Sequence, residues 1–211
     1  MNYVRALRHV DRVSIVGWSY GGARAGGYAV LHPEKVDKLV MLSPAYDRDH
    51  PDATAPEIAT GGAPMFLQPR SGLTALWDPQ IQCPDQVDPA IRDALWNEGL
   101  TADGAAGPQD IGVCHHFRRG TGIDPLAARV QAPSLVIEGE FDHMSSLTTP
   151  ESIRAADADL ETSNKVFVNL ACSSHFALWE TRHLLMFQAS LEWLRASSVN
   201  EVTDGEIRLG D

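Results

Sequence analysis

A serine near the beginning of the chain lies in a pattern typical of a catalytic nucleophile. An apolar run, Val13 to Val16, leads directly into Gly17-Trp18-Ser19-Tyr20-Gly21. A Gly-x-Ser-x-Gly pattern between a strand and a helix predicts a sharp turn that exposes the serine hydroxyl at the edge of a sheet. We expect a strained backbone at Ser19. We also expect that a Cβ on either flanking glycine would clash with the neighbouring strand or helix.

A serine hydroxyl is a weak nucleophile unless a base removes its proton, and the base needs an acid to orient it. Asp142 follows an apolar run at 134–137, and His175 follows another at 165–170. Catalytic groups of parallel sheets collect at the carboxyl ends of the strands. The sequence therefore predicts a triad in the chain order Ser19, Asp142, His175.

Other interpretations of the acid and the base stay open. Asp47, which follows an apolar run at 39–42, is an alternative acid, and Glu140 is a weaker one. Asp142 could instead be a solvated loop carboxylate, and His175 could only cap a helix N-terminus.

The neighbours of the serine indicate how an oxyanion and a substrate would bind. The main-chain N–H of Tyr20 lies at the predicted helix N-terminus, where it can stabilise a developing oxyanion. We expect Trp18, Trp77 and Trp96 to line an apolar substrate pocket, although aromatics such as Trp77 and Trp96 more often form the core of their own region.

The elements that must position these residues alternate between helix and strand. Unalternating apolar runs indicate parallel strands buried on both faces, and His32-Pro33 ends the helix that follows Ser19. The sequence predicts an α/β fold with a mostly parallel sheet of about four strands at 13–16, 39–42, 134–137 and 165–170. The expected flanking helices are 20–31, 149–158 and 176–195, the last with Leu184, Phe187, Leu191 and Leu194 on one face.

The alternation stops between residues 45 and 127, where prolines and glycines are frequent. A structureless loop of this length is improbable in a compact domain, so we expect an inserted helical cap with one helix at 88–99. The predicted core is then 1–44 and 128–196. In the tail, 197–211, Asp204-Gly205 is typical of a hairpin turn.

Charge and length exclude some partners. The chain has 211 residues and a formal net charge of −11, from 17 basic and 28 acidic side chains. An acidic protein is a poor partner for nucleic acid or an anionic membrane, so we expect a small-molecule substrate. The N-terminus lacks the apolar core of a signal peptide.

The cysteines and histidines do not suggest a metal site. Cys83, Cys114 and Cys172 are odd in number and widely spaced, so we expect no disulfide framework and a reducing, cytoplasmic location. A Cys83–Cys114 bridge stays open, and Cys172 is interpreted as an inert buried thiol. His115-His116 lacks further ligand spacing, so no metal is predicted.

With these residues in place, the stretch 3–196 resembles the C-terminal two-thirds of a capped α/β-hydrolase-fold enzyme. The Gly17–Gly21 pattern matches the nucleophile elbow of the family, Asp142 its acid position and His175 its base position. The resemblance implies a serine hydrolase that cleaves carboxylic esters through an acyl-enzyme, without a cofactor. A serine nucleophile points away from haloalkane dehalogenases and epoxide hydrolases, which carry aspartate there.

The resemblance also implies that the first four strands of the family fold, and a second oxyanion donor, would precede residue 3. The strand 13–16 is then expected at a sheet edge, where it could pair with another copy of the chain. A longer enzyme of which this is the C-terminal part is the favoured explanation. Pairing between copies and a shortened enzyme with a rebuilt site are the alternatives.

Function classes other than esterase also fit the pattern. A peptidase or lactonase would use the same triad, and a non-catalytic binding module would retain it as a relic. Substrate identity, chain-length preference and oligomeric state are not encoded in these motifs.

Overall fold

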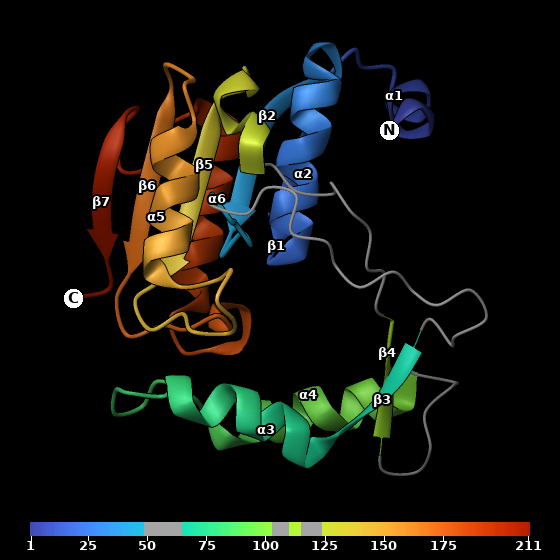
Figure 1. The fold of residues 1–211 in the computed structure, drawn as a ribbon, viewed down its shortest axis with the longest axis vertical. Coiled ribbons are helices and arrows are strands. Elements are labelled where there is room, and N and C mark those ends of the chain that lie inside the picture. Colours follow the sequence, from blue (N-terminus) through green and yellow to red (C-terminus); the bar gives the residue numbers. More distant parts are fainter. Residues whose placement is uncertain (49–64, 103–109, 115–123) are drawn as a thin grey trace.

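The core of the molecule is a five-stranded parallel sheet in a computed structural model that describes residues 1–48, 65–102, 110–114 and 124–211 (Figure 1). The strand order is β1-β2-β5-β6-β7, and every neighbouring pair is parallel. This confirms the α/β class and the mostly parallel sheet, with β1 at its edge. The strands are β1 (Val13–Trp18), β2 (Val36–Leu42), β5 (Ser134–Gly139), β6 (Lys165–Leu170) and β7 (Gly205–Leu209).

Helices cover both faces of this sheet, which explains the unalternating apolar strands. Leu39 and Met41 pack in one cluster with α2 (Tyr20–Leu31) and α5 (Pro150–Asp159). Val40 and Leu42, the intervening residues of β2, pack in a second cluster with α6 (His183–Ala196). The central strands β2, β5 and β6 are therefore mostly buried on both faces, whereas the edge strands β1 and β7 are partly exposed.

The helix expected at 176–195 differs from the prediction at both its start and its buried face. It begins only at His183, after the short 3₁₀ turn η4 (Ala177–Trp179). Leu184, Phe187 and Leu191 are 67%, 45% and 46% exposed, and the buried face consists of Met186, Ala189, Ser190 and Trp193. Helical spacing identifies an apolar stripe, but the sheet determines which stripe is covered.

The hairpin expected in the tail is wrong. Gly205–Leu209 forms β7, a fifth strand that pairs in parallel with β6. Val199 and Val202 make an isolated antiparallel bridge before it. Ile207 and Leu209 pack against the α6 cluster, so the tail extends the core sheet. The apolar edge of β6 offers more burial than a hairpin at the surface would.

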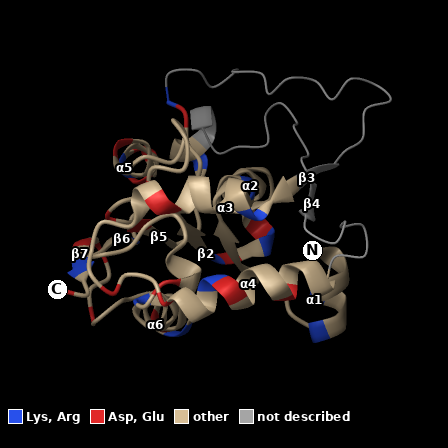
Figure 2. Ribbon diagram, turned by 90° about the horizontal axis from the view of Figure 1, so that it is seen from below, with Lys and Arg blue, Asp and Glu red and all other residues tan. Residues whose placement is uncertain are grey.

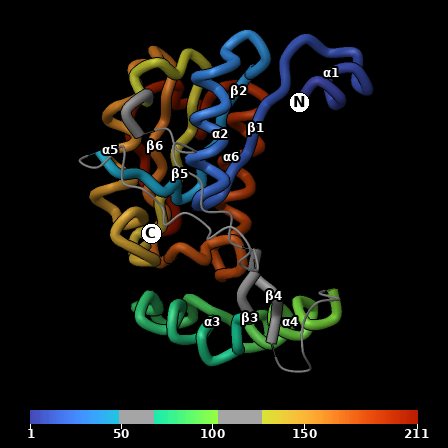
Figure 3. The backbone as a smooth tube through the Cα atoms, turned by 45° about the vertical axis from the view of Figure 1, so that its right-hand side comes forward, coloured from blue at the N-terminus to red at the C-terminus, as the bar shows by residue number. Residues whose placement is uncertain are grey.

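A second group of elements lies at the carboxyl ends of the strands (Figures 1 and 3). The helix expected at 88–99 is confirmed as part of α4, and an unpredicted antiparallel pair, β3 and β4, accompanies it. Figure 2 views this side of the molecule, where Arg70 of α3 pairs with Asp93 of α4, and Arg92 of α4 pairs with Asp78 of η2. The elements are β3 (Met65–Pro69), α3 (Arg70–Trp77), η2 (Asp78–Gln80), α4 (Pro89–Ala102) and β4 (Asp110–Cys114).

The remaining described elements are short. They are α1 (Asn2–Arg8), which buries none of its residues, η1 (Pro33–Lys35) and η3 (Asp124–Arg129). None of the described helices combines the length and the apolar character that crossing a membrane requires. The division into core, cap and tail stays a prediction.

Candidate active site

Ser19 lies at the sharp turn from β1 into α2. Its φ of 56° and ψ of −127° confirm the expected strain, because a non-glycine residue rarely adopts a positive φ. A Cβ on Gly17 would lie 2.3 Å from the carbonyl oxygen of Gly21, so the turn requires glycine there. The same expectation for Gly21 is wrong, because a Cβ at that position would point into open space.

A buried acid–base pair lies in the loops that follow β5 and β6. His175 Nδ1 is 3.0 Å from each carboxylate oxygen of Asp142, and the two side chains are 2% and 0% exposed. The loops themselves are in close contact, since a Cβ on Gly139 would lie 2.5 Å from the carbonyl oxygen of Ser174. The adjacency of β5 and β6 therefore brings together residues 33 positions apart.

Trp18 connects the base to the serine turn. Its indole N–H donates to the carbonyl oxygen of His175 at 2.9 Å, and the two rings are 5.2 Å apart. Among the described residues, no hydrogen bond joins the Ser19 hydroxyl to His175. Such contacts often form only when substrate is bound. Tyr20 is the first residue of α2, so the helix does not use its main-chain N–H.

The two alternative acids are placed differently from Asp142. The carboxylate in contact with the His175 ring is that of Asp142. Asp47 lies in the loop after β2. Glu140 accepts hydrogen bonds at 2.9 Å from the Cys172 N–H and from Arg208. Burial acts to raise the pKa of Glu140, but these donors hold it below its ordinary value.

Glu138, on β5, is a buried carboxylate that the motifs do not reveal. It is 1% exposed and accepts hydrogen bonds from Asn169 at 2.6 Å and Arg154 at 3.3 Å. Burial raises the pKa of Glu138 to about 7, against the opposing effect of these two donors. The folded protein therefore binds a proton at Glu138 that the unfolded chain releases near pH 4.5.

This difference predicts a pH-dependent stability. The contribution of Glu138 is fully present below about pH 4.5 and is lost as the pH rises through 7, because only the folded state then retains the proton. The shift corresponds to at most about 3 kcal/mol. Glu138→Gln, measured by urea unfolding from pH 5 to pH 8, should gain stability relative to the parent protein as the pH rises. Parallel curves would contradict the prediction, and Glu161→Gln, an exposed acid, is the control.

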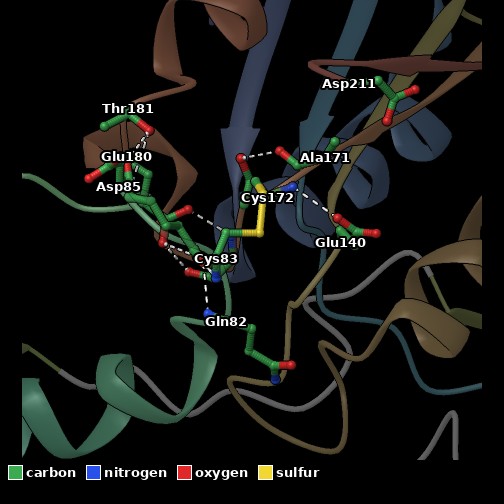
Figure 4. Close-up of a disulfide and its surroundings, with 12 residues drawn as sticks. Gln82, Cys83, Asp85, Glu140, Ala171, Cys172, Glu180, Thr181 and Asp211 are labelled. Carbon is green, nitrogen blue, oxygen red and sulfur yellow. Dashed lines mark hydrogen bonds between the residues drawn. A yellow bond between two sulfur atoms is a disulfide. The ribbon is translucent and has the colours of Figure 1, made fainter.

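A disulfide joins Cys83 to Cys172, across 89 positions of sequence (Figure 4). The expectations of no disulfide and of an inert Cys172 thiol are wrong, and Cys83 does not pair with Cys114. The bond links the segment after α3 to the loop that carries His175. Closing a loop of this length stabilises the fold by about 4–5 kcal/mol in the chain-entropy model. The cysteine count therefore no longer supports a reducing compartment.

The three tryptophans expected to contact substrate lie in two places. Trp18 packs on His175 and, edge to face, on Trp179. Trp77 and Trp96 are 1% and 4% exposed, and both line a cavity of about 330 Å³ between α3 and α4. Trp77 also stacks on Phe176, the residue after His175.

Two buried polar residues at the site escaped the sequence motifs. Gln80 is 1% exposed and accepts hydrogen bonds from the main chain of His143 and His175. Glu180 is fully buried and bonds to Ser174 and Trp77. Most of these partners are 63 to 103 positions away in the chain, so no local spacing could have indicated the contacts.

The described residues contain no group of three or more histidine, cysteine, aspartate or glutamate side chains that could hold a metal ion. His115-His116 lies outside the residues that the structure describes.

The sequence matches the family model described as alpha/beta hydrolase fold over residues 1–181. Solved structures with the same fold include a monoacylglycerol lipase from Paleococcus ferrophilus (TM-score 0.60, 20% identity, 93% of this chain and 72% of that one). A serine hydrolase involved in carbazole degradation, CarC, has a TM-score of 0.54 and 20% identity over 87% of this chain and 64% of that one. The putative non-heme bromoperoxidase BpoC from Mycobacterium tuberculosis H37Rv has a TM-score of 0.53 and 14% identity over 94% and 72%. At these identities the likeness shows the fold alone. Comparison with curated proteins found no match.

Proposed function

The chain belongs to the α/β-hydrolase family, and from this membership we propose that it is a serine hydrolase that cleaves carboxylic esters. One observation carries the proposal. The buried Asp142–His175 pair lies against Trp18, the residue before a serine whose φ is positive. Nucleophilic catalysis requires a serine and an oriented imidazole close to each other, and the contact of Trp18 with His175 supports this arrangement.

In the proposed reaction, the Ser19 hydroxyl oxygen attacks the ester carbonyl carbon. His175 takes the hydroxyl proton on Nε2 and transfers it to the leaving alcohol. Asp142 accepts the hydrogen bond of the Nδ1–H, which holds the imidazole in the tautomer that leaves Nε2 free, and it stabilises the imidazolium. The Tyr20 N–H, at the positive end of α2, stabilises the oxyanion.

The resulting acyl-enzyme is hydrolysed by the same groups. Water attacks the acyl carbon while His175 takes its proton, and the proton then passes to the departing Ser19 oxygen. The products are the carboxylic acid and free enzyme, so the cycle needs no redox or group-transfer partner. The proposal includes contacts between an apolar substrate group and Trp18, Trp77 and Trp96.

Two further parts of the proposal concern pairing between copies of the chain and the location of the enzyme in the cell. The edge strand β1, in which Val16 is 51% exposed, is a candidate for pairing with a second copy of the chain. The cytoplasmic location stays a prediction.

Labelling with a fluorophosphonate tests the proposed nucleophile directly. An activated serine attacks the phosphorus and becomes covalently modified, whereas an ordinary serine hydroxyl does not react at neutral pH. We expect mass spectrometry to locate one modification on Ser19, and Ser19→Ala to abolish it. A folded sample that takes up no probe would contradict the proposal and favour a non-catalytic binding module.

The class of substrate is tested with matched chromogenic compounds. Three compounds are compared. A p-nitrophenyl ester offers an ester bond, a p-nitroanilide of the same acyl group offers an amide bond, and a lactone offers a cyclic ester bond. We expect the ester to have the highest kcat/KM. Faster cleavage of the anilide or of the lactone would replace the esterase assignment by a peptidase or a lactonase.

A further inference from the structure

The segment Trp77–Gln86, which begins with the last residue of α3 and ends before α4, contacts the loop of Asp142 and the loop of His175. Gln80 is the central residue of these contacts and is 1% exposed. Its side-chain oxygen accepts a hydrogen bond from the His143 N–H at 3.1 Å and another from the His175 N–H at 3.2 Å. One oxygen atom thus joins the main chain directly after the acid to the main chain of the base.

Gln80 is itself held by two further hydrogen bonds, one from its side chain and one to its main chain. Its amide nitrogen donates to the carbonyl oxygen of Leu76 at 2.8 Å, in the last turn of α3. Its main-chain carbonyl accepts from the side chain of Gln86 at 3.0 Å. Contacts outside the two loops, at the end of α3 and at Gln86, therefore also hold the residue that carries the bridging oxygen.

Glu180 provides a second connection between the same segment and the base loop. Its carboxylate accepts hydrogen bonds from the N–H and the hydroxyl of Ser174, at 2.7 and 2.5 Å. It also accepts from the indole of Trp77 at 2.9 Å and the amide of Gln86 at 3.1 Å. These four donors compensate the burial of the carboxylate, and they join Trp77 and Gln86 to the residue before His175.

The disulfide is a third connection, and it is covalent. Cys83 lies within the segment, and Cys172 lies three positions before His175 (Figure 4). The segment is thus attached to the loop of His175 on both sides of this residue, at Cys172 before it and at Glu180 after it, so a displacement of the segment would be transmitted to His175. The contacts at Gln80 carry this coupling most directly, since they include the N–H of His175 itself.

We propose that Gln80 is a positioning residue that sets the geometry of the Asp142–His175 hydrogen bond from outside the core sheet. This inference rests on the proposed function for its effect on catalysis. Without the Gln80 oxygen, two N–H groups beside the pair lose their acceptor, and the two loops separate or rotate to find another. A misplacement of about 1 Å costs on the order of 10²-fold in rate.

Gln80→Leu tests the proposal, because leucine has a similar size but no acceptor. We expect kcat for a p-nitrophenyl ester to fall by about 10- to 100-fold, with KM changed less than about threefold, since the substrate-contacting groups stay in place. A weaker bond to Asp142 stabilises the imidazolium less. The acidic limb of the kcat/KM profile should therefore move to lower pH. Gln82→Leu, the same change at an exposed position of the segment, is the matched control.

A spectroscopic readout follows the pair without reference to activity. An imidazole N–H bonded to a buried carboxylate gives a low-field proton resonance, and we expect His175 Nδ1–H to show one in the parent protein and in Gln82→Leu. In Gln80→Leu this resonance should move upfield or broaden through exchange with solvent. Unchanged resonance and unchanged kcat in a folded Gln80→Leu variant would overturn the proposal.

A second variant covers the case in which Gln80→Leu does not fold. Gln80→Glu retains the acceptor for the His175 N–H, loses the donor to the Leu76 carbonyl and adds a negative charge, so the acidic limb should move to higher pH, opposite to Gln80→Leu. No shift, or one to lower pH, would overturn the proposal. If the fluorophosphonate leaves Ser19 unmodified while the resonance still responds at Gln80, the proposed hydrolysis fails and the positioning stands. If the fluorophosphonate labels Ser19 but the resonance does not change when Gln80 is substituted, the proposed hydrolysis stands and the positioning role of Gln80 fails.

Discussion

Ser19→Ala is expected to lower kcat/KM for p-nitrophenyl butyrate by about 10⁶-fold, the loss seen when the nucleophile of a serine hydrolase triad is removed. The variant keeps the acid–base pair and the Tyr20 N–H but has no atom that can form the acyl-enzyme. Alanine is no more strained than serine at a φ of 56°, so the turn should keep its conformation. Steady-state kinetics and the thermal unfolding midpoint measure the two expectations.

The matched control for this experiment is Ser146→Ala, an exposed serine in the loop after β5. It should hydrolyse the ester at the parental rate. If Ser19→Ala retains more than a hundredth of the parental kcat/KM in a pure sample, another group is the nucleophile, and the proposed mechanism is wrong.

Asp142→Asn is expected to lower kcat by about 10⁴-fold, which is the effect of the same change in a serine protease triad. The asparagine fits the space of the buried aspartate but presents an NH₂ group to His175 Nδ1. The imidazole then carries its proton on Nε2 and cannot accept one from Ser19. Steady-state kinetics from pH 6 to pH 9 should show the loss throughout, with partial recovery at high pH, where hydroxide replaces the base.

The two alternative acids supply the controls for this prediction. Asp47→Asn and Glu140→Gln should each change kcat by less than about tenfold, because the carboxylate bonded to the His175 ring is that of Asp142. A large loss in Asp47→Asn, together with a small loss in Asp142→Asn, would transfer the role of the acid to Asp47.

The fold class and the turn at Ser19 follow from local patterns. The run Val13–Val16 before Gly17 correctly predicts a strand, although its edge position leaves Val16 51% exposed, and Pro33 correctly ends α2 at Leu31. These features depend on residues a few positions apart, whose backbone preferences act whatever the rest of the chain does. Ser19, Asp142 and His175 could likewise be selected as a candidate triad from the sequence, since each of them follows a predicted strand.

Tertiary structure alone decided which distant groups meet. It brought Asp142 to the His175 ring, joined Cys83 to Cys172, and left Leu184 exposed on a helix whose apolar stripe looked like a buried face. It also placed β7 beside β6, and Gln80 between the loops that carry Asp142 and His175. Such contacts depend on how the strands are ordered and on what covers each face, and neither is encoded in the spacing of neighbouring residues.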